Sequence, residues 1–285
     1  MVDIDISNLE FRIQPQVLTK LSSLSESSEI NYIQLEKVIQ SDQNLVGVLL
    51  KMVNSSFYSR GNTISSLKTA LSILGFKLIK TLAMTFSTQM IFSGSTYTRF
   101  NKYVWKHSIV TAILCKWLND KKNIADPEIV FLAGILHDIG KVVLSETDRK
   151  AFINVINDTT ESGNYFHVIE KKYFQVDHNE AGEKIVESWN LSKDIGLACK
   201  YHELDSEIPA DLLPRQKGLL QVLRVANYLS HKLDYGHLAY AEDDLAKKVI
   251  TELGFNASNI EGLLQEAQDF LEVDDFSVYF LKKIG

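Results

Sequence analysis

A run of apolar residues with the spacing of one buried helix face lies in the middle of the chain, and ionisable residues interrupt it. The apolar residues of this run are Phe131, Leu132, Ile135, Leu136, Ile139, Val142 and Val143. His137 and Asp138 stand side by side within it, and Lys141 follows one turn after His137. A buried carboxylate needs a partner because its desolvation is costly. A metal ion shared by the imidazole and the carboxylate would supply one. The alternative is a histidine and an aspartate at an exposed helix end.

The remainder of the chain also has the apolar periodicity of helices. Four prolines and fourteen glycines in 285 residues are few, which favours long helices over a turn-rich β architecture. Two helices are expected around Ser66–Leu74 and Lys77–Phe92, separated at Gly75, and a later one around Phe100–Asn119. The short polar segment Ser93–Thr96 is the expected internal boundary. We therefore predict an all-α protein with an N-terminal helical subdomain, residues 1–95, followed by a helical bundle, residues 96–285.

Charge and composition disfavour several classes of partner. The net charge is −6 and the basic residues form no dense run, which disfavours binding to nucleic acid. We expect no membrane span, because no apolar run approaches the ~20 residues that cross a bilayer. The N-terminus lacks the basic and apolar regions of a signal peptide, and Cys115 and Cys199 stand among apolar residues, as reduced core thiols do. A cytoplasmic location is therefore expected.

Six polar residues fall on the apolar faces of five successive predicted helices. They are His107, His137, Asp138, His178, His202 and Asn227. A single histidine on such a face is more often a hydrogen-bonded core residue than a ligand. In a helical bundle, however, these faces converge on one core, so that the six groups require a shared metal ion or a hydrogen-bond network. Imidazole and carboxylate ligands suit Fe, Mn, Ni or Zn, and the sequence does not choose among these metals.

The N-terminal segments resemble those of a known family. The segments Gln14–Pro15, Ser41–Leu45, Leu50–Tyr58 and Ile64–Gly75 are similar to those of the HDOD family, and the most diagnostic are Asn54–Tyr58 and Ala70–Gly75. The resemblance extends from about Phe11 to the region of Tyr228. It implies an N-terminal helical subdomain packed on a bundle related to the HD and HD-GYP metal-dependent phosphohydrolases.

The resemblance also implies roles for individual residues. His107, His137 and Asp138 match the first metal ligands, and His178 and His202 match the extra histidines of the larger HD-GYP site. Lys141 would meet a phosphate, and His178 would act as a proton shuttle. Two departures weaken the match. Asn227 replaces the closing aspartate, and Tyr201 replaces one of two consecutive histidines. No Gly-Tyr-Pro element, the fingerprint of cyclic di-GMP hydrolysis, follows Glu203.

Three classes of function remain open. The first is a regulatory HDOD signalling protein that retains part of a metal site with little or no hydrolysis. The second is a working metal-dependent phosphohydrolase or phosphodiesterase acting on a nucleotide or cyclic dinucleotide. The third is an interaction scaffold with an empty polar core. The departures favour the first class over the second, and the intact His137–Asp138 pair favours it over the third. We expect the partner to be another signalling protein, with a nucleotide second messenger as a further candidate ligand.

Overall fold

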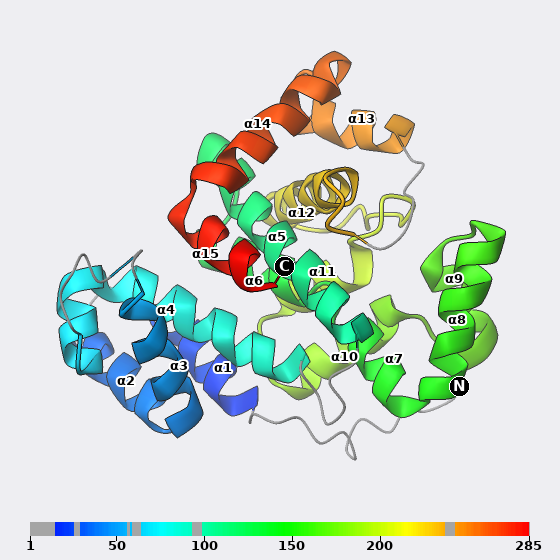
Figure 1. The fold of residues 1–285 in the computed structure, drawn as a ribbon. Helices are drawn as coiled ribbons and strands as arrows, with labels where there is room; N and C mark the ends of the chain where they lie inside the picture. The colour runs from blue at the N-terminus through cyan, green and yellow to red at the C-terminus, as the bar shows by residue number, and fades with distance from the viewer. Residues whose placement is uncertain are drawn as a thin grey trace. The chain divides into compact units, whose positions relative to one another are not determined.

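All secondary structure in the described part of the chain is helical (Figure 1). The computed structural model describes residues 15–25, 29–55, 58, 64–92, 99–236 and 243–284. The all-α prediction is confirmed. The described residues fall into two compact units, one within residues 11–95 and the other within residues 96–285. The predicted boundary Ser93–Thr96 and Phe57 of the Asn54–Tyr58 segment lie outside the described residues.

The described residues of the N-terminal unit form four helices: α1 (Pro15–Ser23), α2 (Glu29–Gln40), α3 (Gln43–Val53) and α4 (Leu67–Phe92). The carboxylate of Asp42 caps α3 by accepting hydrogen bonds from the backbone N–H groups of Asn44 and Leu45, at 2.9 and 3.1 Å. Asn54, in one of the two diagnostic segments, donates to the carbonyl of Ile64 and accepts from its N–H, both at 2.7 Å. This side chain therefore joins the end of α3 to the residues that precede α4.

Helix α4 consists of two helical segments that meet at Gly75, as predicted. Gly75 has φ 82° and ψ 167°, a conformation that residues with a side chain rarely adopt. By length and composition alone α4 could cross a membrane, with a mean hydropathy of 1.3 over its most apolar 18 residues. This differs from our expectation that no segment would reach that length. Because 56% of that window is buried inside the protein, α4 has the character of a core helix.

The C-terminal unit is built around α5 (Arg99–Lys122), which packs against α6 (Pro127–Leu136) and α12 (Pro214–Lys232). Helix α10 (His178–Ser188) packs against α7 (Ile139–Thr147) and α11 (Lys193–Tyr201). Helices α8 (Arg149–Ser162) and α9 (Phe166–Phe174) pair with each other, and Gly163 ends α8 in the left-handed conformation. The last helices are α13 (Asp243–Glu252), the 3₁₀ helix η2 (Ala257–Asn259), α14 (Ile260–Val273) and α15 (Asp275–Ile284).

The apolar run of residues 131–143 is not one continuous helix, contrary to the sequence prediction. Helix α6 ends at Leu136 and α7 begins at Ile139, so His137 and Asp138 form the turn between them. Asp138 has φ −98° and ψ 9°, which takes the backbone out of the α-helical path. The interruption places two consecutive polar side chains in the same buried region, where a continuous helix would turn them about 100° apart.

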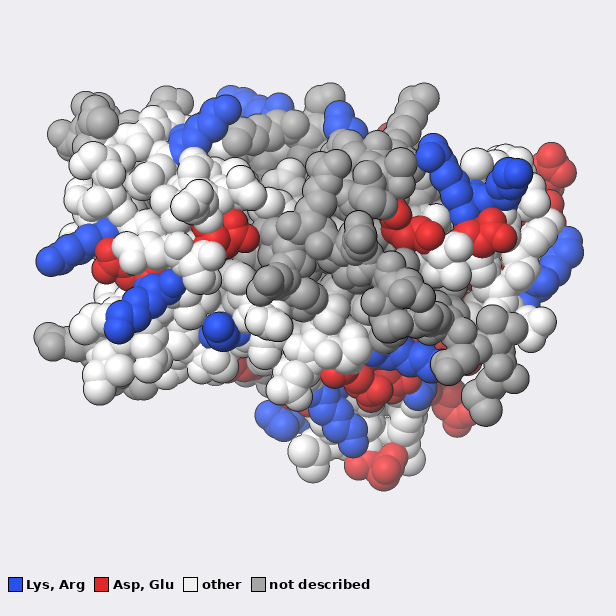
Figure 2. All heavy atoms as spheres, turned by 90° about the horizontal axis from the view of Figure 1, so that it is seen from below, with Lys and Arg blue, Asp and Glu red and all other residues white. Residues whose placement is uncertain are grey.

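Acidic and basic side chains are interspersed on the face drawn in Figure 2, and neither sign fills a broad patch among the residues described there. Cys115 and Cys199 are free and buried, as expected for core thiols. The absence of a nucleic-acid partner and the cytoplasmic location stay predictions.

Candidate metal centre

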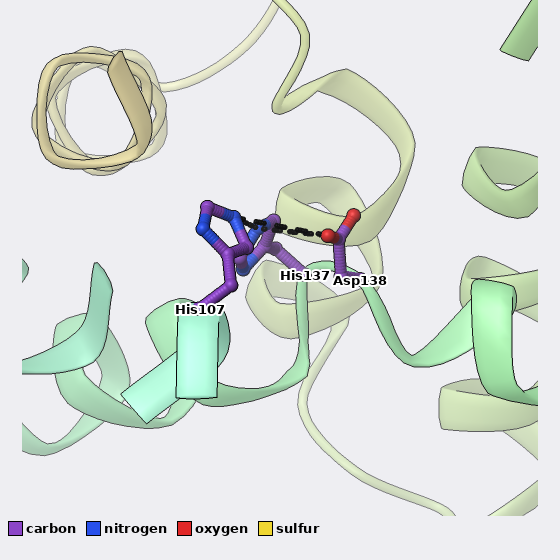
Figure 3. Close-up of side chains that lie close together, drawn as sticks. All are labelled: His107, His137 and Asp138. Atoms are coloured by element: carbon purple, nitrogen blue, oxygen red, sulfur yellow. Dashed lines mark hydrogen bonds and ion pairs between the residues drawn. The ribbon is translucent and has the colours of Figure 1, made fainter. Parts of the chain in front are cut away.

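His107, His137 and Asp138 point toward one another in the interior of the C-terminal unit (Figure 3). His107 comes from the middle of α5, and the other two come from the α6–α7 turn. The Nε2 atoms of His107 and His137 lie 3.2 Å apart. Asp138 Oδ2 lies 3.8 Å from His107 Nε2 and 3.6 Å from His137 Nε2. All three side chains are buried, so their polar atoms must satisfy one another or a shared ligand.

The second oxygen of Asp138 faces a second pair of histidines. Oδ1 lies 3.6 Å from His178 Nε2, at the start of α10, and 3.3 Å from His202 Nε2, directly after α11. These two Nε2 atoms are 3.3 Å apart. Asp138, His178 and His202 thus form a second group that could hold a cation. The structure brings five of the six predicted residues together, with Asp138 shared between two histidine pairs.

Backbone and side-chain contacts orient the histidine rings. Nδ1 of His137 lies 2.8 Å from the Gly134 carbonyl oxygen, and Nδ1 of His202 lies 2.8 Å from the Cys199 carbonyl oxygen. A carbonyl only accepts, so each Nδ1 carries the proton, and in a neutral ring Nε2 presents its lone pair to the cluster. A fixed ring with an unprotonated nitrogen facing inward is the usual form of a metal-binding histidine.

The cluster separates its histidines into two protonation classes. Burial, together with the neighbouring His137, lowers the pKa of His107 to about 3. Burial likewise lowers the pKa of His137 to about 3, against the attraction of Asp138. These two rings are neutral at pH 7, the state that binds a metal. Burial also acts against a charge on His178, but the carboxylate of Glu170 outweighs it and raises the pKa of His178 to about 10. Without a cation, His178 is therefore protonated at pH 7.

Lys141 lies beside the carboxylate of Asp138. Its ammonium group donates a hydrogen bond to Oδ2 at 2.8 Å. Burial acts against the charged form of Asp138, but Lys141 and His137 hold the pKa of that carboxyl well below its usual range. In the structure Lys141 thus neutralises Asp138, and its ammonium group would have to leave this oxygen to meet a phosphate.

The cluster faces a small cavity in the C-terminal unit. This cavity has a volume of about 40 Å³ and is lined by Phe100, Tyr103, Val104, His107, Asp138, Lys141, Ile156, Phe166 and His231. A water molecule occupies about 30 Å³ of the liquid, whereas pockets for small organic ligands measure about 300–1,000 Å³. The cavity therefore has the size of one or two water molecules, and aromatic and aliphatic side chains form most of its wall.

Asn227 is buried on α12, and its side-chain oxygen has no hydrogen-bond partner among the residues described. One turn later on the same helix, Ser230 Oγ lies 3.1 Å from Nδ1 of His107. Residues three apart share a helix face, so Asn227 lies on the side of α12 that meets His107. It is the one predicted residue for which no direct contact with the other five is described.

Sequence reasoning missed three residues of the site. Glu170 on α9 contacts His178, and Glu203 Oε1 lies 3.4 Å from His178 Nε2 and 3.6 Å from His202 Nε2. His231 packs against His107 with the ring centroids 4.5 Å apart. Glu170 and Glu203 are buried as completely as the histidines. The one available signal was the direct adjacency of Glu203 to His202, since Glu170 and His231 are separated from their contacts by longer stretches of chain.

Comparison with known proteins agrees with the resemblance seen in the sequence. Residues 12–204 match the HDOD domain family. An uncharacterized protein of Treponema pallidum (strain Nichols) is 24% identical over 227 residues. The match covers 77% of this chain and 42% of that protein, so the chain spans less than half of the relative's length.

Solved structures show the same fold at low sequence identity. An HDOD domain protein from Geobacter sulfurreducens superposes with a TM-score of 0.73 at 20% identity, covering 94% of both chains. A Marinobacter aquaeolei VT8 protein named for signal transduction has a TM-score of 0.70 at 20% identity, covering 96% of this chain and 59% of that one. A Shewanella amazonensis SB2B protein named as a phosphohydrolase has a TM-score of 0.66 at 18% identity, covering 96% and 94%. At these identities the likeness establishes the fold alone.

Proposed function

Because the chain belongs to the HDOD domain family, we propose that it is a signalling module that binds a divalent metal ion at the histidine–aspartate cluster and hydrolyses nucleotides poorly or not at all. The metal is Fe, Mn, Ni or Zn, and the ligands are drawn from His107, His137, Asp138, His178 and His202. Its partner in this proposal is another signalling protein.

The donor atoms fit such an ion. Oriented, buried imidazoles converge on a carboxylate whose Oδ1 makes no hydrogen bond to any described residue. An interior with this donor set is costly unless a cation or protons compensate it. When bound, a divalent ion would lower the pKa of a neighbouring water and polarise a phosphoryl oxygen. The protein's own contribution is a dry, shaped wall and rings held in a fixed orientation.

The size of the cavity is the observation that carries the regulatory proposal. A space of about 40 Å³ next to His107 and Asp138 is far smaller than the pockets that hold nucleotides. Lys141 donates a hydrogen bond to Asp138, and Asn227 stands at the position where the family resemblance implies an aspartate. These features support binding without efficient turnover of a nucleotide-sized substrate.

A metal-dependent phosphohydrolase acting on a nucleotide or cyclic dinucleotide is the second candidate. One observation favours it: Lys141 lines the cavity together with His107 and Asp138, which places a cation beside the cluster. In this alternative Lys141 binds phosphate and His178 moves a proton. A substrate would require Phe100 and Phe166 to move apart, because both form the cavity wall.

Metal analysis and a turnover assay on one preparation test the proposal. We expect the purified chain to retain or take up at least one Mn²⁺, Fe²⁺, Ni²⁺ or Zn²⁺ ion, and His137→Gln to bind it much more weakly. The loaded protein should leave cyclic di-GMP and simpler phosphodiesters essentially intact. Turnover at an ordinary enzymatic rate of ~1 s⁻¹ or more would establish the second candidate instead. If the chain takes up no metal under any loading condition, the interaction scaffold with an empty polar core is the one class of function that remains.

A further inference from the structure

Four potential ligand atoms lie in the second half of the cluster, one more than the histidine–aspartate group alone supplies. They are His178 Nε2, His202 Nε2, Asp138 Oδ1 and Glu203 Oε1. The two nitrogens are 3.3 Å apart. Asp138 Oδ1 lies 3.6 Å from His178 Nε2 and 3.3 Å from His202 Nε2. Glu203 Oε1 lies 3.4 Å from His178 Nε2 and 3.6 Å from His202 Nε2.

The five separations that involve a histidine nitrogen match the edges of a coordination tetrahedron. Nitrogen and oxygen ligands lie about 2.0–2.2 Å from a four-coordinate zinc ion, and the edge of a tetrahedron is about 1.63 times that radius, or roughly 3.4 Å. The five distances above range from 3.3 to 3.6 Å. The two histidine nitrogens are therefore spaced from each other, and from an oxygen of each carboxylate, as ligands of one ion would be.

The chemistry of these atoms also requires a shared positive charge. Nδ1 of His202 donates to the Cys199 carbonyl, so Nε2 of the neutral ring is an acceptor. The ionised carboxylates of Asp138 and Glu203 offer only acceptors, and Asp138 Oδ1, one of the four atoms, makes no hydrogen bond to a described residue. A proton on one ring satisfies only the atoms that it faces. A cation at the centre satisfies all four at once.

Glu170 fixes the orientation of His178 from the far side of the ring. Its Oε2 accepts a hydrogen bond from His178 Nδ1 at 2.6 Å and a second from the backbone N–H of His178 at 2.8 Å. Glu170 comes from α9, eight residues before His178, and is completely buried. A carboxylate on one ring nitrogen, with the other nitrogen facing a metal, is the usual arrangement of a held metal ligand. Glu170 thus acts on the site through His178.

We propose that Glu203 is a ligand of a second cation, which it binds together with His178, His202 and the Oδ1 oxygen of Asp138, and that Glu170 is the positioning residue of this site. The inference rests on the proposed metal-binding function and extends it to residues that no sequence motif indicated. It predicts two cations per chain, with one oxygen of the Asp138 carboxylate facing each. Substitution of Glu203 or Glu170 should weaken the binding of one cation and not of the other.

Cobalt titration of the full chain, stripped with chelator, tests the assignment. Co²⁺ absorbs visible light strongly in four-coordinate sites, so absorption and calorimetry together report both stoichiometry and geometry. We expect the wild type to bind two Co²⁺ ions. Glu170→Gln should weaken one of the two by about 10–100-fold, the usual effect of removing a carboxylate that supports a ligand, and Glu203→Gln should weaken the same ion at least as much; both should leave the other ion unchanged. Thermal unfolding in chelator checks that each variant is folded.

Glu183→Gln is the matched control. Glu183 is a carboxylate on α10 that pairs with Lys200 at 2.7 Å, outside the cluster, so its removal should leave both ions unaffected. If Glu203→Gln binds as many ions as the wild type, with the same affinity, Glu203 is not a ligand. That result would overturn the ligand assignment but not the proposed metal-binding function. No uptake by the wild type would overturn the proposed function itself. If Glu203→Gln does not fold, anomalous scattering from wild-type crystals soaked in Co²⁺ decides: an ion within bonding distance of Glu203 Oε1 supports the assignment, and an ion out of its reach overturns it.

Discussion

Gly140 lies so close to His178 that a Cβ atom at residue 140 would come within 1.9 Å of the His178 carbonyl oxygen and 2.7 Å of the Gly182 nitrogen. The first turn of α7 therefore packs directly on the first turn of α10. This approach sets the position of the His178 backbone, and only glycine permits it.

Gly140→Ala should separate α7 from α10 and displace His178 from the cluster. We expect a loss of about 1–3 kcal/mol in the free energy of unfolding, as for overpacked core sites, together with weaker cation binding. Urea denaturation and metal titration measure the two effects. The control is Gly47→Ala in the exposed part of α3, where no atom lies within 4 Å of the new Cβ, and it should gain about 0.5–1 kcal/mol. Gly140→Ala with wild-type stability and affinity would show that α7 and α10 separate without cost.

Lys141→Met should destabilise the metal-free protein more than the metal-bound one. Removing one partner of a buried ion pair typically costs about 3–5 kcal/mol, and Asp138 would lose its hydrogen bond from Lys141. A cation beside Asp138 supplies a replacement charge, so the loss should shrink when metal is added. Chemical denaturation with chelator and with Mn²⁺ gives the comparison.

Lys116→Met controls for the loss of a lysine charge. Lys116 pairs with Asp120 at 2.7 Å, but both side chains are 52% exposed, so the expected change is only about 0–1 kcal/mol and independent of metal. Equal losses for Lys141→Met with and without Mn²⁺ would argue against a cation at Asp138.

Asn227→Asp tests whether the missing carboxylate limits metal affinity. The substitution adds a charged oxygen in the same volume on the face of α12 that contacts His107. Without metal, a carboxylate in this buried position should destabilise the fold by ~1–3 kcal/mol or carry a raised pKa. With metal, affinity and thermal stability should rise together. The measurement is the melting temperature with Mn²⁺ or Fe²⁺ minus that with chelator, compared with the parent protein.

Asn119→Asp provides the reference for a buried asparagine away from the cluster. Asn119 is on α5 twelve residues after His107, about 18 Å along the helix. Its effect should be the same with and without metal. If Asn227→Asp also behaves in this way, Asn227 is an ordinary core residue and not part of a metal site.

The metal-free protein should lose stability as the pH falls below about 6.5. Burial lowers the pKa of His107 and of His137 from 6.5 to about 3. Between pH 3 and pH 6.5 the unfolded chain therefore binds protons at these residues that the folded protein does not bind. Each such proton gives a slope of about 1.4 kcal/mol per pH unit. His178, with its pKa raised to about 10, is protonated in both states well below pH 6.5, and its contribution to stability is lost progressively as the pH rises from about 6.5 to about 10.

Urea denaturation in chelator at several pH values between 4 and 7 measures this slope. Burial lowers the pKa of His231 as well, so His137→Gln removes one of at least three histidines that titrate in this way and should flatten the curve. A parent protein whose stability is constant across this interval would contradict the neutral, buried state of His107 and His137.

The apolar faces of the predicted helices were sufficient to indicate the fold and the location of the cluster. His107, His178 and His202 each stood on such a face, and faces of one bundle meet in its core. The turn at His137–Asp138 was not predictable, because a buried apolar run has the same pattern whether it forms one helix or two. The role of Glu170 depends on the contact between α9 and α10, which no local pattern encodes. Glu203 lies beyond the end of α11, where helical periodicity no longer indicates the direction of a side chain.

The sharing of Asp138 between two histidine pairs has a consequence for how the chain is held together. Cations bound at both oxygens would connect α5, the α6–α7 turn, α10 and the residues after α11, which are up to 95 positions apart between His107 and His202. Such a site acts as a reversible cross-link, because the ions bind only where folding has brought these distant ligands together, and their binding free energy then adds to the stability of the folded chain. Loss of the ions would then require several helices to loosen together. Exchange with free metal should accordingly be slow, and the chain should acquire its ions while it folds.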